Sequence, residues 1–160
     1  MPAKNISELL DNNHIKYVCV KHSPAYTAQE LAQTSHISGK HIAKTVIVKM
    51  DGNLAMVVLT ANDKINLSKL SQSLGRDHIE LATEREFKDK FPGCEVGAMP
   101  PFGNLYHMDV FVDEKLTKDP EIAFNAGSHS ELVRMTYADF ANLVHPKVLS
   151  ASQASLQSSH

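Results

Sequence analysis

The sequence predicts one α+β domain, a mixed α/β fold in which a mixed sheet is flanked by helices. The chain has 160 residues, of which 42% are apolar and 21% charged, as is ordinary for a single soluble globular domain. Two strand-like segments, residues 42–50 and 54–60, are separated by Asp51-Gly52, a typical hairpin turn. Helical and strand patterns are interspersed around this antiparallel pair, which favours an α+β or mixed α/β arrangement over a doubly wound fold.

The domain is expected to span residues 1–149, followed by a disordered Ser/Gln-rich tail over residues 150–160. No apolar run approaches the roughly 18 residues that a membrane span needs. The N-terminus carries no signal-peptide core, and Cys19 and Cys94 are too few for a secreted disulfide framework. We therefore expect a soluble cytoplasmic protein without membrane contact.

Local signals define the elements before the hairpin. Residues 7–14 begin with Ser, a preferred N-cap, and are predicted to form a helix. Residues 15–21 are rich in β-branched and aromatic side chains and are predicted to form a strand, which a loop over residues 22–26 follows. Residues 27–35 begin with Thr and carry Glu three positions later, the spacing of a capping box that opens a helix. Gly39 then separates this helix from the hairpin.

After the hairpin, Asn66 and Ser68 are alternative caps for a helix that ends at Leu74 and is closed by Gly75. Residues 78–81 are predicted to form a short strand. These signals place a helix between two strands in the middle of the chain.

A second capping box begins at Thr83 and opens a helix that Pro92-Gly93 ends. Residues 91–103 contain six Gly or Pro among thirteen residues, which predicts a loop of fixed shape. The remaining pattern predicts three strands, over residues 105–112, 121–125 and 131–135. A last helix is predicted over residues 136–145, and Pro146 ends it.

Metal and nucleotide cofactors are not expected. Cys19 and His22 have a CxxH spacing, but residues three apart on a strand point to opposite faces. No second ligand pair of zinc-finger spacing follows, and the chain has neither a GxGxxG nor a Walker A motif. The sequence therefore predicts no cofactor.

Three segments carry candidate chemistry. Lys44 stands near the start of an apolar strand; a lysine in a cleft there suits a phosphate or a carbonyl oxygen, with an ordinary edge lysine as the plain alternative. Residues 97–103 form a rigid Gly/Pro loop that either aims backbone N–H groups at an oxyanion or is simply a turn. Residues 125–129, Asn-Ala-Gly-Ser-His, turn between two strands and can present a hydroxyl and an imidazole to a pocket.

Covalent catalysis has little support in the sequence. Cys94 lies in the Gly/Pro loop without an identifiable partner base, so an inert thiol is the favoured interpretation. The chain has no GxSxG elbow, and no Asp stands at a spacing that would identify a Ser-His-Asp triad. Neither a Ser nor a Cys is therefore predicted to be an activated nucleophile.

In this order and spacing, these segments resemble the YbaK/EbsC family, the free-standing relatives of the prolyl-tRNA synthetase editing domain. The matching residues are 41–48 around Lys44, 97–101 in the Gly/Pro loop, and 124–129 in the turn. The opening segment, residues 22–28, is also similar to the strand-loop-helix with which the family begins. The resemblance runs from about residue 5 to residue 145.

The resemblance implies a compact mixed sheet, partly closed like a barrel, and hydrolysis of a wrongly attached, small amino acid from the 3′ end of tRNA. It places Lys44 against the aminoacyl-adenosine end, the backbone of Gly97 against the aminoacyl carbonyl, and His129 beside the pocket, where it helps to select side chains. We count these three residues as catalytic. The residues predicted to bind substrate are Tyr26, Thr45, Pro101, Asn125, Gly127 and Ser128.

The charge of the chain limits how it holds RNA. Sixteen basic and eighteen acidic residues give a net charge of −2, which argues against a general binder of phosphate backbones. Nine histidines and a basic surplus in the N-terminal half still allow a limited contact with a tRNA end. The predicted partner is therefore the aminoacyl-tRNA 3′ end, captured alone or through an aminoacyl-tRNA synthetase or elongation factor, and not DNA.

The hypothesis is metal-independent attack of water on the aminoacyl ester, with Lys44 positioning the substrate and the Gly97 loop polarising its carbonyl. Two alternatives stay open. A non-catalytic ligand- or tRNA-binding domain would keep the same pocket without turnover. A general esterase would cleave small esters without tRNA, but no activated Ser or Cys supports it.

Overall fold

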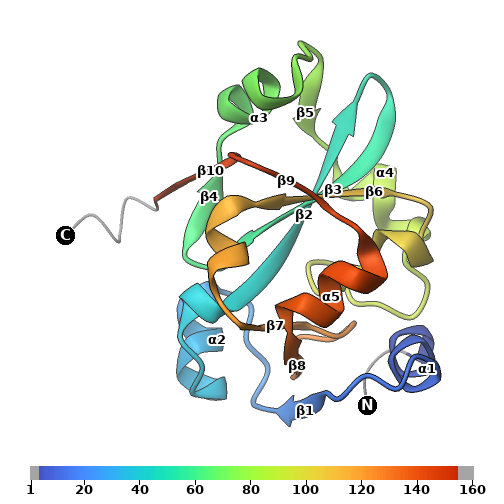
Figure 1. Cartoon of the computed structure of the whole chain (residues 1–160), viewed down its shortest axis with the longest axis vertical. Helices are drawn as coiled ribbons and strands as arrows, with labels where there is room; N and C mark the ends of the chain where they lie inside the picture. Colours follow the sequence, from blue (N-terminus) through green and yellow to red (C-terminus); the bar gives the residue numbers. More distant parts are fainter. Residues whose placement is uncertain (1–3, 155–160) are drawn as a thin grey trace.

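The computed structural model of the chain describes residues 4–154, which form helices packed around a mixed sheet (Figure 1). The α-helices are α1 (Lys4–Asn12), α2 (Ala28–Ser35), α3 (Leu67–Leu74), α4 (Glu84–Phe87) and α5 (Tyr137–Val144). The strands are β1 (Val18–Lys21), β2 (Ile42–Met50), β3 (Asn53–Thr60), β4 (Asp63–Ile65), β5 (Ile79–Leu81), β6 (Asp109–Asp113), β7 (Glu121–Asn125), β8 (Glu131–Thr136), β9 (Lys147–Leu149) and β10 (Ser152–Ala154). Short 3₁₀ turns are η1 (Gly39–His41), η2 (Lys88–Lys90), η3 (Gly103–Leu105) and η4 (Glu114–Lys118).

The main sheet has the strand order β1-β8-β7-β2-β3-β6-β9, with β5 paired to β2 outside this path. The pairs β2–β7, β3–β6 and β6–β9 are parallel, and the remaining pairs are antiparallel. This mixture confirms the predicted α+β fold class. A separate two-stranded sheet joins β10 to β4.

Strand β2 organises this sheet because it has a different neighbour at each end. It pairs with β3 along all but its first residue, from Ala43 opposite Thr60 to Met50 opposite Asn53. On its other side, its first residues pair with β7 and its last residues pair with β5. The start of β2, which carries Lys44, therefore lies beside β7.

The core lies on both faces of the sheet. The larger cluster includes Phe102, Phe124 and Phe140, all fully buried, and the ring of Phe102 lies 5.3 Å and 5.4 Å from the other two. Burial of one such ring contributes roughly 1.5–3 kcal/mol. A smaller cluster on the opposite side packs Leu31 of α2 against Ile42 and other apolar residues of the sheet.

The predicted hairpin and the helix starts predicted after the first helix are confirmed, whereas the cap predicted at Ser7 is wrong, because Ser7 lies inside α1. Strands β2 and β3 are antiparallel and joined at Asp51-Gly52. The side chains of the N-cap residues accept hydrogen bonds from backbone N–H groups in the first helical turn; these residues are Thr27, Asn66, Thr83 and Thr136. Each cap satisfies one of the donors that a helix start leaves unpaired.

Several predicted boundaries are wrong by a few residues. The first helix already includes Lys4, ahead of the predicted start at Ser7, and the first strand is confined to β1. The strand predicted from residue 105 begins at Asp109, because η3 and the left-handed backbone of His107, with a φ of 58°, precede it. The second capping-box helix is a single turn continued by η2.

The disordered tail predicted from residue 150 is wrong for residues 150–154. Ala151 is fully buried, its N–H donates to Oδ1 of the buried Asp113 at 2.8 Å, and its carbonyl accepts from the N–H of Asn66 at 2.7 Å. Ser152 and its two successors then pair with β4 as β10. These distant partners are invisible in the local pattern, and residues 155–160 lie outside the described part of the chain.

Among residues 4–154, no helix has the length and apolar character to cross a membrane.

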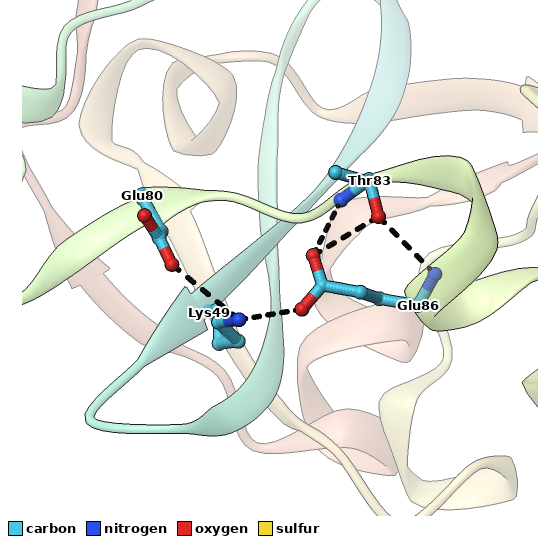
Figure 2. A network of polar contacts seen from close by, with 4 residues as sticks. All are labelled: Lys49, Glu80, Thr83 and Glu86. Carbon is cyan, nitrogen blue, oxygen red and sulfur yellow. Dashed lines mark hydrogen bonds and ion pairs between the residues drawn. The ribbon is translucent and has the colours of Figure 1, made fainter.

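The far end of β2 is held by a polar network (Figure 2). The ammonium of Lys49 lies between two carboxylates, 2.5 Å from Oε2 of Glu86 and 3.4 Å from Oε1 of Glu80. Glu86 also accepts from the N–H and hydroxyl of Thr83, so the capping box of α4 and the lysine of β2 share one carboxylate.

This network predicts an unusual titration. The hydrogen bonds from Lys49 and Thr83 lower the pKa of Glu86 from 4.5 to about 2. Because the folded pKa is the lower one, the ionised carboxylate stabilises the fold above the unfolded pKa, and this contribution is lost as the pH falls toward 2. We expect an NMR titration of the Glu86 carboxyl carbon to show a midpoint near 2, and a clearly higher one in Lys49→Met. Lys88→Met, which removes a lysine that does not contact Glu86, should leave the midpoint unchanged; a wild-type midpoint near 4.5 would contradict the network.

Candidate functional site

A small cavity opens where the start of β2, the N-terminal end of α2 and two loops meet. Its volume is about 250 Å³. Its lining combines apolar and polar residues in similar proportion: Ala25, Tyr26, Thr27, Leu31, Ile42, Ala43, Lys44, Ala61, Gly97, Asn125 and His129. Polar groups that converge on a concave surface with apolar walls suit the binding of a small polar ligand. The structure thus brings together five of the nine predicted site residues.

The parallel pairing of β2 with β7 places Lys44 next to Asn125. Ile42 is opposite Ala123, and Ala43 is opposite Phe124 in this ladder. Lys44 and Asn125 each follow two residues after the pair Ile42 and Ala123, so their side chains point to the same face of the sheet as that pair. A lysine and an amide that are 81 positions apart in sequence therefore share one cavity.

The amine of Lys44 has no hydrogen bond or ion pair among residues 4–154. Burial lowers its pKa below the usual lysine value, and the charge of Asp63 partly opposes this effect. The carboxylate of Asp63 is itself held by the hydroxyl of Thr60 at 2.7 Å. A half-buried cation without a direct partner is costly unless a ligand supplies an acceptor.

The Gly/Pro loop is hydrogen-bonded to the turn that follows β7. The N–H of Glu95 donates to the carbonyl of Gly127 at 2.7 Å, and the N–H of Gly127 donates to the carbonyl of Ala98 at 2.9 Å. The N–H of His129 donates to Oε1 of Glu95 at 2.8 Å, and its Nε2 lies 2.7 Å from the carbonyl oxygen of Val96. These four bonds hold the two predicted segments as one rigid wall.

The bond to Val96 sets the tautomer of His129. A carbonyl oxygen only accepts, so Nε2 carries the proton and Nδ1 of the neutral ring is an acceptor. The ring of Tyr26, which is 70% exposed, lies 4.7 Å from the imidazole at an angle of 44°. Tyr26 and His129 therefore form the mouth of the cavity.

Gly97 is required at its position by backbone geometry and by space. Its φ is +86°, and a Cβ there would lie 3.3 Å from Cε1 of His129. The N–H of Gly97 is directed at the sulfur of Met99 at 3.2 Å, and a thioether is only a weak acceptor. This N–H is thus a donor that a ligand oxygen could engage more strongly.

Asn125 offers a second underused polar group. Its side chain lines the cavity, and its Oδ1 is buried without a hydrogen-bond partner among the described residues. Buried polar atoms are rarely left unpaired in folded proteins. Lys44, Gly97 and Asn125 therefore line one cavity, and each brings a polar group that is unpaired or weakly bonded within residues 4–154.

The other four predicted site residues lie outside the lining. Thr45 is opposite Val58 and points to the other face of the sheet from Lys44, because neighbouring strand residues alternate. Pro101 is a buried residue of the Gly/Pro loop, and the backbone of Gly127 is hydrogen-bonded to that loop. The hydroxyl of Ser128 contacts that of Ser130 at 3.3 Å. Direct contact of these four residues with substrate stays a prediction. None of them lines the cavity, so they lie where they can support the residues that do.

The sequence did not reveal the role of Glu95, which accepts a hydrogen bond from the N–H of His129, or of Asp63, whose charge raises the pKa of Lys44. No local pattern marks either residue, since each acts on a partner that is distant in sequence. Cys94 is not in the cavity; its thiol contacts the hydroxyl of Tyr106 at 3.6 Å, and burial raises its pKa. That environment disfavours the thiolate that a nucleophile needs.

Known proteins resemble this chain in sequence and in fold. Residues 22–143 match the family described as aminoacyl-tRNA editing domain. The multifunctional Ser/Thr-tRNA deacylase ProXp-y of Escherichia coli (strain K12) is 32% identical over 118 residues, which cover 67% of this chain and 66% of that protein. The proline–tRNA ligase of Lactococcus lactis subsp. lactis (strain IL1403) is 34% identical over 92 residues, 58% of this chain and 15% of the ligase.

The crystal structure of the hypothetical protein APE2540 has a TM-score of 0.83 to this fold at 20% identity, covering 94% of this chain and 100% of that one. At this identity the likeness concerns the fold alone. The chain spans just under two thirds of the length of the deacylase and about one seventh of the ligase.

The geometry of Gly97 predicts a specific effect of substitution. Gly97→Ala places a side chain at a left-handed φ and against His129, whereas Gly93→Ala meets the same backbone strain, at a φ of +81°, in open space. Both should lower the free energy of unfolding by about 1–2 kcal/mol. Only Gly97→Ala should also shift the imidazole ¹H–¹⁵N signal of His129. If both variants leave that signal in place, the close approach of Gly97 to the ring is wrong.

Proposed function

We propose that this chain, which belongs to the aminoacyl-tRNA editing domain family, hydrolyses the ester that joins a mischarged amino acid to the 3′ end of tRNA. The observation that carries the proposal is a cluster of polar groups in one small cavity whose bonding is incomplete among residues 4–154: the unpaired Lys44 amine, the unpaired Oδ1 of Asn125 and the N–H of Gly97, which has only a weak sulfur acceptor. An aminoacyl ester supplies the acceptors and donors that these groups lack.

The reaction needs no covalent intermediate. Water adds to the carbonyl carbon of the ester, and the carbonyl oxygen takes the electron pair as an oxyanion. The bond to the ribose oxygen then breaks, and that oxygen receives a proton, giving a free amino acid and an uncharged tRNA end. A positioned water and a stabilised oxyanion are sufficient for an ester, which is already activated.

Each residue of the cavity has a role in this scheme. The N–H of Gly97 donates to the carbonyl oxygen as negative charge develops there, in place of its weak contact with sulfur. The ammonium of Lys44 holds the aminoacyl-adenosine end as a compact cation. His129 bounds the space for the side chain and offers Nδ1 as an acceptor, and the neighbouring ribose hydroxyl of the tRNA assists the proton transfer.

The size of the cavity supports a small amino acid as the group removed. Small alanine side chains form part of the lining at Ala25 and Ala61, and the space is about 250 Å³. One methylene changes discrimination by only about 1–3 kcal/mol, so neighbouring small amino acids compete. The E. coli relative is named for seryl and threonyl substrates, which also have small side chains.

The chain acts without a metal, because its own donors suffice for an activated ester. It works on aminoacyl-tRNA in the cytoplasm, and its net charge of −2 favours capture of tRNA together with a synthetase or an elongation factor. Similarity to a proline–tRNA ligase supports the synthetase as that partner.

The test is a deacylation panel with tRNAs charged with Ala, Ser, Thr, Cys and Pro. We expect selective release of one or two amino acids by the wild type. Lys44→Ala should lower kcat/KM by about 100-fold or more, because it removes the cation that orients the ester. Lys88→Ala removes the same charge outside the cavity and should retain wild-type activity.

Two outcomes would contradict parts of this proposal. Wild-type rates from Lys44→Ala at subsaturating tRNA would remove the role of the lysine. No release across the panel from folded wild type would overturn the hydrolase and favour a non-catalytic binding domain, which ligand-induced thermal stabilisation would detect.

A further inference from the structure

A second cavity, of about 310 Å³, lies at the other end of α2. It is formed by the segment after α2, by η1, by the start of β7 and by one side chain of β8. Its lining mixes apolar and charged residues: His36, Ile37, Ser38, His41, Pro120, Glu121, Ile122, Ala123 and Arg134. None of the groups assigned to the reaction above belongs to it.

Both cavities open on the same face of the sheet. Ala123 pairs with Ile42 of β2 on one side and with Arg134 of β8 on the other, and paired side chains point to one face. Lys44 and Asn125 lie two residues beyond members of this row and share that face. Helix α2 covers the row between the cavities and lies beside the end at which β2 begins (Figure 1).

The length of α2 gives the separation of the two cavities. Thr27, its N-cap, lines the first cavity, and His36, its C-cap, lines the second. The eight residues between them span about 12 Å at 1.5 Å per residue. A single nucleic-acid strand advances at least about 3.4 Å per nucleotide, so the second cavity is reached within about three or four nucleotides, and within fewer when the strand is extended.

Two opposite charges face this cavity without a partner in the described part of the chain. Glu121 and Arg134 lie on neighbouring strands, diagonal to each other on one face, since Glu121 is opposite Thr136 and Arg134 is opposite Ala123. Such diagonal positions are about 7–8 Å apart and within reach of long side chains. By contrast, His41 is already paired with Asp119 at 3.1 Å. The free pair leaves room for a ligand that carries both a donor and acceptors.

We propose, on the basis of the proposed function, that this second cavity binds a cytosine that precedes the terminal adenosine of the tRNA. A carboxylate accepts from the exocyclic amino group of cytosine, and a guanidinium donates to its ring nitrogen and carbonyl oxygen. Ile37, Pro120 and Ala123 provide apolar surface for the face of the base. A phosphate is disfavoured, because Glu121 and the C-terminal end of α2 both present negative charge.

The proposal is tested by binding, which does not depend on turnover. The probes are the trinucleotides CCA and UUA, titrated against the full chain and followed by NMR. Wild type should bind CCA about tenfold more tightly than UUA, since uracil has a carbonyl oxygen in place of the amino group that donates to Glu121, and an N–H in place of the ring nitrogen that accepts from Arg134. The signals of Ile37 and Ala123 should shift with CCA. Glu121→Gln and Arg134→Gln should each bring the two affinities within about twofold.

Matched variants separate this site from the reaction site. Arg76→Gln removes an arginine paired with Asp51 elsewhere on the surface and should retain the preference for CCA. Lys44→Ala should weaken both trinucleotides alike and keep their ratio. Equal affinities in wild type, or a preference unchanged in both cavity variants, would overturn the cytosine site. Preferential binding of CCA together with a failed deacylation panel would overturn only the proposed function.

Discussion

The pairing of the first residues of β2 with β7 is the constraint on which the rest of the site depends. It aligns Ile42 with Ala123 and thereby sets Lys44 and Asn125 on one face of the sheet. Strand β2 can accept this neighbour because β5 takes over the same edge only at its far end, where Lys49 is held between two carboxylates. One long strand thus serves as the floor of the site at its start and as a structural anchor at its end.

The walls of the cavity are rigid for a different reason. Two segments that are irregular in themselves, the Gly/Pro loop and the turn after β7, satisfy each other's backbone groups through the bonds that join Glu95, Gly127 and Ala98. This leaves the N–H of Gly97 against a weak acceptor and the imidazole of His129 in one tautomer. The backbone groups that join the two segments are therefore hydrogen-bonded to each other, whereas the N–H of Gly97 and the Oδ1 of Asn125 are left weakly bonded or unpaired within residues 4–154. Such preorganised donors are what an ester hydrolysis can use.

Helix α2 connects the two cavities on the same face of the sheet. Its N-terminal end contributes Thr27 to one, and its C-terminal end contributes His36 to the other. The first offers a cation and free hydrogen-bonding groups, and the second offers one carboxylate and one guanidinium on neighbouring strands. On the proposed function, a near-neutral chain would hold an RNA end by shape and by a few specific contacts, without the dense positive charge of a general RNA binder.

The sequence by itself determined the elements whose causes are local. The Asp51-Gly52 hairpin and the caps at Thr27, Asn66, Thr83 and Thr136 each depend on residues a few positions apart, and all are confirmed. Thr45 is different: we predicted it to bind substrate beside Lys44, although the alternation of side chains along a strand directs the two residues to opposite faces. The order of the three motif segments also predicted the family, to which residues 22–143 belong.

Only the tertiary structure decided which of these segments meet. Three arrangements bring together residues that are distant in sequence. Strand β10 pairs with β4, Glu95 accepts a hydrogen bond from the N–H of His129, and Glu121 lies diagonally opposite Arg134 on neighbouring strands. The Ser- and Gln-rich segment after residue 149 has no local signal for a strand, yet Asp113 and Asn66 supply partners for its backbone. A backbone donor or acceptor bonds to whatever the fold brings near, so such contacts follow from the packing of the whole chain and not from its neighbours in sequence.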